Sequence, residues 1–404
     1  MTVTTPREPR AVASPVSGSA SSVSGSPAIP GRLPSERLES ATAARTVLLA
    51  AVGLLACLGV LAVQSSSATT RSPGFEPIYL TRHLINLALG VALAAGVARV
   101  PPVQWCRFAW WIYGGAVLLL LLVAVPGVGL SAGGACRWLR LPGFTLQPSE
   151  WAKLAVPLLA ARVLSGRAHV LDQLVLLVSA AGVFALVLRQ PDLGTTMLLA
   201  GGLGIALVLG DWPLRRLLAL GFAGVAVVAI GTLRGYQLRR IEGLWATWQD
   251  WREAPYQLRQ SLVCFGEGGW TGVGLGRGWQ KLSFLPEGHT DFVVAVIGEE
   301  LGVVGVAFVA ACWLAVLAAG TRLIMLQPLG SFRFILGATL LLQLVTQAAL
   351  NGAVVTALVP PTGIPHPLLS YGGNSLLVTM VSLGLLLSCT QVPRDAVLPR
   401  EVPQ

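Results

Sequence analysis

The sequence has few charged residues. Of its 404 residues, 54% are hydrophobic and only 11% carry a charged side chain, whereas charged residues make up about a quarter of a soluble globular domain. This shortage excludes an ordinary soluble enzyme and indicates a membrane protein. The 28 Lys and Arg residues outnumber the 18 Asp and Glu residues, which gives a formal net charge of +10. Because the basic residues mostly lie between apolar blocks, we attribute the excess to topology control and contact with anionic lipid rather than to nucleic acid.

Three common sequence signals are missing. No short apolar segment followed by a small-residue cleavage site precedes the first apolar block, so we predict an uncleaved first span. The glycine-rich segment 266–278 does not fit G-x-G-x-x-G and has no βαβ context, which excludes a nucleotide cradle. Its glycines instead favour a flexible backbone that approaches a ligand closely. The absence of an internal repeat with interrupted helices disfavours a transporter.

The six cysteines place few constraints on the fold. Four of them lie in or near apolar blocks, where a thiol behaves as a small hydrophobic group. Cys136 and Cys264 fall in connecting segments that we place on the same side of the membrane. A disulfide between them could form, although pairing cannot be read from a sequence.

Ten apolar blocks follow Arg45 and are separated by Arg, Pro or Gly residues. A helix needs about 20 residues to cross the hydrocarbon core of a membrane, where every backbone polar group must be paired within the protein. We therefore predict an all-α polytopic membrane protein with about ten transmembrane helices. The predicted spans are 46–65, 83–98, 108–126, 148–164, 170–188, 193–210, 213–233, 292–317, 334–357 and 367–389.

The distribution of arginine predicts the orientation of these spans. With the N-terminus in the cytoplasm, every inside loop carries a pair of arginines and the short outer loops carry a thinner set, so the positive-inside rule places both termini in the cytoplasm. Residues 1–44, rich in Ser, Pro, Ala and Arg, are predicted as a disordered cytoplasmic tail. Residues 45–391 form the predicted membrane domain, and residues 392–404 form a cytoplasmic C-terminal tail.

A large extracytoplasmic loop, residues 234–291, is predicted between the seventh and eighth spans. It contains five tryptophans, and connections of this length are functional or disordered. Within 238–252, apolar and aromatic residues repeat at helical spacing opposite a charged face, which indicates a helix in the membrane interface. The alternative is an amphipathic helix that packs on the protein and has no role at the lipid.

The end of this loop gathers Lys281, Glu287, His289 and Asp291 just before the eighth span. A carboxylate at the lip of a membrane cavity is partly desolvated, and this raises its pKa and suits it to accept a proton. Asp291 is the leading candidate for such a base, but aspartate is also a favoured N-cap residue, so a capping role is equally open. Glu287 and His289 alone do not make a metal site.

Polar residues within or beside the spans also need a reason, because charge inside a membrane is costly. Glu150 and Lys153 stand three residues apart on one helix face, a spacing that predicts a salt bridge. The others are Asp192, Glu299, Glu300 and Asn351. For each of them, a structural role between helices and a catalytic role both remain open.

The order and spacing of seven segments resemble the SEDS family of membrane proteins (shape, elongation, division and sporulation), most closely its division branch. The resemblance covers the chain from the first span onward. The segments are 135–139 (ACRWL), 147–153 (QPSEWAK), 190–195 (QPDLGT), 256–262 (YQLRQSL), 285–292 (LPEGHTDF), 297–302 (IGEELG) and 365–375 (PHPLLSYGGNS).

This resemblance implies a ten-span glycosyltransferase that polymerises lipid II, the undecaprenyl-pyrophosphate-linked disaccharide pentapeptide, into peptidoglycan. The family's essential acidic residue falls on Asp291, which favours the general base over the cap. The predicted substrate-binding residues are Arg137, Glu150 and Lys153, which match family motif positions, together with Lys281, Glu287 and His289.

The implied chemistry begins when Asp291 takes the proton of the acceptor hydroxyl. Positive charge for the leaving pyrophosphate would come from Arg137, Lys153, other outer arginines or a divalent cation, Mg²⁺ or Mn²⁺; no organic cofactor is expected. The expected partners are lipid II, membrane lipid, a class B penicillin-binding protein and other division proteins, and not nucleic acid. The expected location is the inner membrane at the division septum.

Two alternatives remain open: a polymerase of the family's elongation branch, and a lipid II flippase or other transporter. The sequence also departs from the family pattern at three positions. Thr362 stands where many division members carry Lys, His366 where a small or apolar residue is common, and Asn374 where Ser or Thr is usual. These departures weaken any carry-over of function to the loop before the last span.

Overall fold

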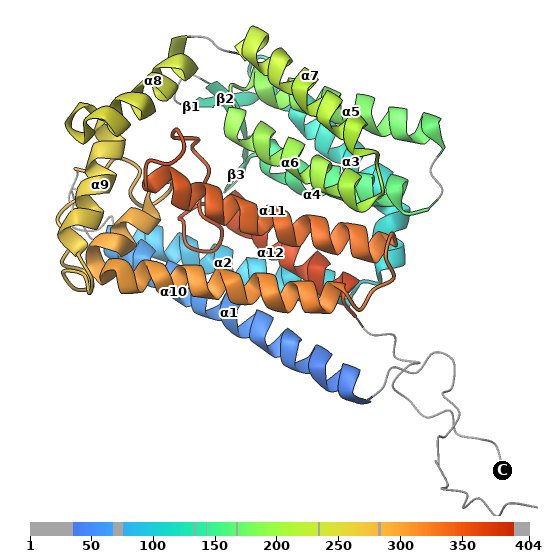
Figure 1. Ribbon diagram of the computed structural model, residues 1–404, viewed down its shortest axis with the longest axis horizontal. Helices are drawn as coiled ribbons and strands as arrows, with labels where there is room; N and C mark the ends of the chain where they lie inside the picture. The colour runs from blue at the N-terminus through green and yellow to red at the C-terminus, as the bar shows by residue number, and fades with distance from the viewer. Residues whose placement is uncertain are drawn as a thin grey trace, which may run out of the picture.

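The structure is a computed structural model that describes residues 35–67, 76–132, 135–142, 144–166, 169–232, 235–281 and 284–391 (Figure 1). Each of the ten predicted spans corresponds to a helix. These helices are α1 (Ser35–Ser67), α2 (Glu76–Arg99), α3 (Pro102–Val123), α4 (Pro148–Leu164), α5 (Val170–Arg189), α6 (Leu193–Leu209), α7 (Leu214–Thr232), α10 (Val293–Ile324), α11 (Phe332–Val355) and α12 (Gly373–Cys389).

The bundle has an interior layer and a periphery. Almost every residue of α4 is buried, as are most residues of α11 and α12, whereas α2, α3 and α5 expose long apolar faces. Among the described residues, six helices are long and apolar enough to cross a membrane, namely α1, α2, α3, α5, α10 and α11; α6 and α12 are shorter apolar helices. The protein is therefore a multi-pass membrane protein, in agreement with the predicted fold class.

Helix α1 begins earlier than the sequence suggested. It starts at Ser35, so the predicted disorder of residues 1–44 is wrong for residues 35–44, and residues 1–34 lie outside the described part. Ala41, Ala44 and Leu48 are buried at helical spacing, and this packing extends the helix beyond the apolar block itself. The predicted C-terminal tail, residues 392–404, also lies outside the described residues.

A small antiparallel sheet between α3 and α4 was not predicted. It consists of β1 (Gly129–Ala132), β2 (Ala135–Leu141) and β3 (Phe144–Leu146), in the order β1-β2-β3. Gly129 pairs with Leu139, and Leu139 pairs in turn with Leu146. The sheet lies at the same end of the bundle as α8 and α9 (Figure 1), and its middle strand carries Arg137.

The large loop is mostly helical. It contains α8 (Gly235–Gln249), a 3-10 turn (Trp251–Glu253) and α9 (Tyr256–Gly268). Trp245 and Trp248 are 66% and 63% exposed, and Ile241 is 50% exposed, so much of the apolar face of α8 is not covered by the described protein, although Leu244 packs against the core. A helix in the membrane interface requires such an exposed apolar face, and this location stays a prediction.

Helix α10 is interrupted at Gly302, whose φ of +66° favours glycine. The glycine-rich segment 269–274 lies against this break and exchanges backbone hydrogen bonds with the helix. Val273 N and Gly274 N donate to Glu299 O and Glu300 O (both 3.0 Å), and Val303 N and Val304 N donate to Gly269 O (3.0 Å) and Trp270 O (3.1 Å). A Cβ atom at Gly272 would lie 2.1 Å from Glu300 O, so these glycines admit the backbone of α10.

Candidate active site

Asp291 lies two residues before the first residue of α10. The N-cap of this helix is Phe292, and no side chain caps it. The capping alternative for Asp291 is therefore wrong. Among the described residues, burial and neighbouring charges act on the Asp291 carboxylate, and no hydrogen bond does.

The surroundings of Asp291 suit a general base. Burial and the neighbouring Glu287 carboxylate raise the pKa of Asp291 to about 6, and the charge of Asp192 adds to this rise, whereas Arg240 and Arg137 oppose it. A carboxylate with a pKa near 6 is still ionised at neutral pH and is a stronger base than an ordinary aspartate. Carboxyl groups with such shifted pKa values concentrate at functional sites.

The segment between α11 and α12 lies beside the Asp291 carboxylate. An ideal Cβ atom at Gly363 would lie 3.6 Å from Asp291 Oδ2, and Gly363 has a φ of +71°. Helix α8 contacts the same segment: Arg240 donates to Pro361 O, and Trp248 Nε1 donates to Ala357 O at 2.7 Å. Helix α8 thereby holds a guanidinium group close to the acidic site.

Glu287 and His289 flank Asp291 along the chain and differ in their surroundings. Glu287 is exposed, adopts a φ of +57°, and its Oε2 accepts a hydrogen bond from Thr290 Oγ1 at 2.8 Å. The His289 ring packs against the rings of Tyr79 and Tyr371, with centroid distances of 5.6 and 5.9 Å. Burial lowers the pKa of His289 despite the opposing charge of Glu287, so the imidazole is neutral at pH 7.

Arg137 reaches the site from β2 and is used to hold the backbone before α6. Its Nε donates to Gln190 O at 2.8 Å, and its Nη2 donates to Pro191 O at 2.7 Å. This turn carries Asp192, which caps α6 by accepting a hydrogen bond from Thr195 N at 3.0 Å. Arg137 therefore contributes positive charge near Asp291 and also fixes a neighbouring loop.

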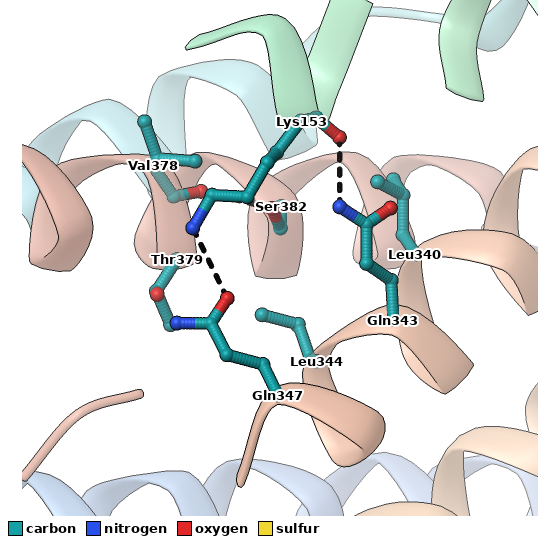
Figure 2. A pocket seen from close by; sticks show the side chains of 8 residues that line it. All are labelled: Lys153, Leu340, Gln343, Leu344, Gln347, Val378, Thr379 and Ser382. Carbon is teal, nitrogen blue, oxygen red and sulfur yellow. Dashed lines mark hydrogen bonds between the residues drawn. The ribbon is translucent and has the colours of Figure 1, made fainter. Parts of the chain in front are cut away.

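Glu150 and Lys153 form the predicted ion pair. Lys153 Nζ lies 2.7 Å from Glu150 Oε2, and both side chains are about 5% exposed. Figure 2 shows that Lys153 also contacts two glutamines of α11: its Nζ donates to Gln347 Oε1 at 3.1 Å, and its carbonyl accepts from Gln343 Nε2 at 3.2 Å. These groups line a cavity between α4, α11 and α12 that has room for about one water molecule.

Lys281 is paired elsewhere. Its Nζ lies 2.6 Å from Glu300 Oε1 and donates to Ser65 Oγ at 2.7 Å. It is not among the charges that act on Asp291. The structure therefore groups Asp291 with Arg137, Glu287 and His289, and it places Glu150 with Lys153, and Lys281 with Glu300, in two separate buried pairs.

Known proteins resemble the chain over most of its length. The family model described as "Cell cycle protein", which covers FtsW, RodA and SpoVE, matches residues 45–394. The chain belongs to this family. A protein of Geobacter metallireducens described as a probable peptidoglycan glycosyltransferase FtsW is 38% identical over 85% of this chain and 93% of its own length. A protein of Geobacter sp. strain M18 with the same description is 37% identical over 87% of this chain and 97% of its own length.

Two solved structures of the SEDS family share the fold. One is titled as a peptidoglycan synthase complex that coordinates polymerization and crosslinking; its matching chain is 30% identical, has a TM-score of 0.69, and matches over 86% of this chain and 97% of its own length. The other is the rod shape determining protein RodA of Thermus thermophilus, which is 28% identical, has a TM-score of 0.63, and matches over 87% of this chain and 97% of its own length.

The departures from the SEDS pattern have structural explanations at two positions. Asn374 joins α12 to the sheet, because its Nδ2 donates to Thr145 O at 2.7 Å and its Oδ1 accepts from Gln147 N at 3.2 Å. His366 is buried, and its ring packs against Trp313 at 5.8 Å. The hydroxyl of Thr362 is buried and has no partner among the described residues.

Sequence reasoning missed the contributions of Arg240, Asn351 and Gly363 to this SEDS site. Asn351 had a detectable signal, since it is a polar residue within a span, but its contact with Asp291 O depends on the fold. Arg240 was visible only as part of the charged face of an amphipathic helix. Gly363 gave no signal of its own.

All six cysteines are free, so Cys136 and Cys264 do not form the disulfide that the sequence left open.

Proposed function

We propose that this chain polymerises lipid II into β-1,4-linked glycan strands for septal cell-wall synthesis, with Asp291 as the general base. Membership of the SEDS family and the descriptions of its relatives make the chain a peptidoglycan glycosyltransferase. The observation that carries the proposed role of Asp291 is a largely buried carboxylate that does not cap α10 and has a pKa raised to about 6.

The proposed reaction is a single displacement with inversion. Asp291 removes the proton of the 4-hydroxyl of the acceptor GlcNAc, and the oxygen attacks the anomeric carbon of the donor MurNAc. The α-linked pyrophosphate leaves, and a β-1,4 bond forms. Arg137 and Arg240 supply positive charge close to the base, where it can stabilise the departing pyrophosphate.

Lys153 has a different proposed contribution from that of the two arginines. Lys153 is buried in the bundle and paired with Glu150. Its ammonium group also donates to Gln347 of α11, so any effect on the substrate is indirect. The predicted substrate-binding role of Glu150, Lys153 and Lys281 therefore becomes a role in holding α4, α11 and the outer loop in place. Glu287 and His289 remain the proposed direct contacts beside Asp291.

Among the described residues, no group of three His, Cys, Asp or Glu side chains gathers in a way that could hold a metal ion. Mg²⁺ is commonly held by one or two carboxylates together with substrate phosphates. We therefore propose that any required Mg²⁺ or Mn²⁺ arrives with the pyrophosphate, and no step of the reaction above depends on it.

The proposed partner is a class B penicillin-binding protein, which would crosslink the strands that this chain makes. The solved complex that couples polymerization to crosslinking supports this pairing. We also propose that both termini are cytoplasmic, because of the distribution of arginine between the loops. We propose that the protein acts at the septum, because its curated relatives carry the name FtsW at 37–38% identity. A fluorescent fusion on the lateral wall rather than at the septum would favour the elongation alternative.

The activity is tested by reconstitution. Purified protein, lipid II, Mg²⁺ or Mn²⁺ and the penicillin-binding partner are incubated, and glycan strands are resolved by gel electrophoresis. Wild-type protein should form strands, and Asp291→Asn should lower the rate by about 100-fold or more. Glu253→Gln, which neutralises an exposed acidic residue of the same outer loop, is the matched control and should remain active. Normal strand formation by Asp291→Asn would rule out the proposed base.

A further inference from the structure

The backbone that leads to Asp291 is held by three consecutive carbonyl groups. Each of them accepts a hydrogen bond from α11 or from the segment between α11 and α12. The three bonds are Tyr371 N to His289 O (2.8 Å), Ser370 Oγ to Thr290 O (2.5 Å) and Asn351 Nδ2 to Asp291 O (2.7 Å). We call this set the carbonyl clamp.

Asn351 is the member of the carbonyl clamp that acts at the aspartate itself. It lies on α11 and is 1% exposed, and its Nδ2 also donates to Ile364 O at 2.9 Å. One amide group therefore joins the backbone of Asp291 to the segment in which Gly363 faces the carboxylate. The distance between the carboxylate and this wall of the site depends on Asn351.

The side-chain amide nitrogen of Asn351 donates two hydrogen bonds, whereas its amide oxygen accepts none from the described residues. Asn351 Oδ1 is buried and has no partner among the described residues. An unpaired buried acceptor costs free energy, so an amide at this position is a poor choice for packing alone. The two donated bonds are the gain that offsets this cost.

Helix α11 is a rigid support for this contact. Gln347, one turn before Asn351 on the same face, donates to Pro365 O at 2.9 Å, so α11 holds the backbone at Ile364 and Pro365 with two successive amides. Most of α11 is buried within the bundle. A side chain anchored on such an element can fix a reacting group far better than one on a free loop.

We infer that Asn351 is a positioning residue, which sets the place of the Asp291 carboxylate through the carbonyl clamp, with Ser370 as a second fixed point. This inference rests on the proposed role of Asp291 as the base. Asn351 itself transfers no proton, because its amide only donates hydrogen bonds to carbonyl groups. Its effect on the reaction is geometric, and a displacement of about 1 Å at a reacting group can lower a rate by about 100-fold.

The test uses Asn351→Leu, which keeps a similar side-chain size and removes both donated bonds. We expect kcat for lipid II polymerisation to fall by about 10- to 100-fold while KM changes by less than about threefold. We also expect the acidic midpoint of the pH–rate profile to move downwards, because a released carboxylate gains contact with water. The charges that face Asp291, namely Glu287, Arg240, Arg137 and Asp192, are unchanged in this variant.

Two further variants keep the test decisive. Ser388→Ala, at the far end of α12, removes another buried hydrogen bond, from Ser388 Oγ to Val100 O at 2.7 Å, and should leave kcat and the acidic midpoint unchanged. Ser370→Ala removes the neighbouring bond of the carbonyl clamp, together with the bond that Ser370 Oγ accepts from His366 N at 2.8 Å, and should lower kcat in the same direction as Asn351→Leu. If Asn351→Leu does not fold, Ser370→Ala decides the outcome.

The outcomes separate this inference from the proposed function. A folded Asn351→Leu protein with wild-type kcat and acidic midpoint overturns the positioning role, as does wild-type behaviour of Ser370→Ala where Asn351→Leu does not fold. Equal losses of kcat in Asn351→Leu and Ser388→Ala, with an unmoved midpoint, also overturn it. Full activity of Asp291→Asn would instead show that the proposed base is wrong.

Discussion

Asp192 and Asp291 occupy similar places in the sequence and have opposite surroundings in the structure. Each follows a loop that contains a proline, and each stands close to the start of a helix. Asp192 caps α6, accepting from Thr195 N, and lies 3.5 Å from Ser149 Oγ. Asp291 lies one residue before the cap position of α10, and the pKa of its carboxylate is set by burial and by neighbouring charges.

The difference shows how a capping carboxylate and the proposed base differ in their surroundings. Hydrogen bonds from backbone N–H groups stabilise the charged form of a capping aspartate. Burial without such bonds destabilises the charged form and raises the pKa. Asp192 belongs to the first case by its position at the cap of α6, whereas Asp291, one residue before the cap position of α10, belongs to the second.

The largest expected effect is on the polymerisation rate, when Asp291 or Asp192 is lengthened by one methylene. Asp291→Glu keeps the charge but moves the carboxylate, and we expect the polymerisation rate to fall by about 100-fold. Asp192→Glu should keep the rate within about threefold of wild type, because its charge acts on Asp291 only from a distance. The measurement is glycan strand formation from lipid II. Equal losses in both variants would contradict the distinction between the two aspartates.

The second effect concerns stability and has opposite signs at the two positions. The pKa of folded Asp291 is raised from 3.8 to about 6, so its protonated form favours folding at low pH, and this contribution is lost as the pH rises through about 6. Asp291→Asn should therefore raise the free energy of unfolding at pH 8 by about 2 to 3 kcal/mol, and by nothing at pH 3. Thermal unfolding of purified protein at both pH values measures this change. A variant less stable than wild type at pH 8 would contradict it.

A smaller loss of stability is expected at Asp192. Asp192→Ala removes the cap of α6 and should lower the free energy of unfolding by about 1 kcal/mol. Asp192→Ser keeps a capping oxygen and should recover most of the loss. The same thermal measurements apply at pH 8, and an Ala variant as stable as wild type would mean that the cap contributes little.

The smallest effect is on the pH dependence of the reaction. The rate of wild-type protein should fall below a midpoint of about pH 6, because Asp291 must be ionised to accept a proton. Asp192→Asn removes a negative charge that raises this pKa, so the midpoint should move down by about a few tenths of a pH unit. An upward shift would show that Asp192 acts on the site in another way.

The two buried ion pairs show how far the sequence could predict the site. Glu150 and Lys153 stand three residues apart on one helix, so their pairing follows from helix geometry alone. Lys281 and Glu300 come from a loop and a helix, and their pairing also involves Ser65 of α1. No local pattern encodes this second contact, and the sequence placed Lys281 beside Asp291 instead.

Regular elements were predictable and close approaches between backbones were not. Apolar length was sufficient to locate all ten span helices, and the charged and aromatic spacing of 238–252 was sufficient to locate α8. The three-stranded sheet escaped prediction because its strands are short and lie in a connecting segment. The glycines of 269–274 were recognised as permitting close approach, but their actual neighbour, the backbone of α10, could be known only from the fold.

The break in α10 has a consequence for the order in which the chain folds. Glu299 O, Glu300 O, Val303 N and Val304 N lack helical partners across Gly302 and are paired by the segment 269–274, which is synthesised before them. Unpaired backbone groups are costly in a bilayer. The outer part of α10 therefore completes its hydrogen bonding only after this segment has docked on it. The outer loop is therefore part of what allows α10 to lie in the membrane as a broken helix with its backbone groups paired.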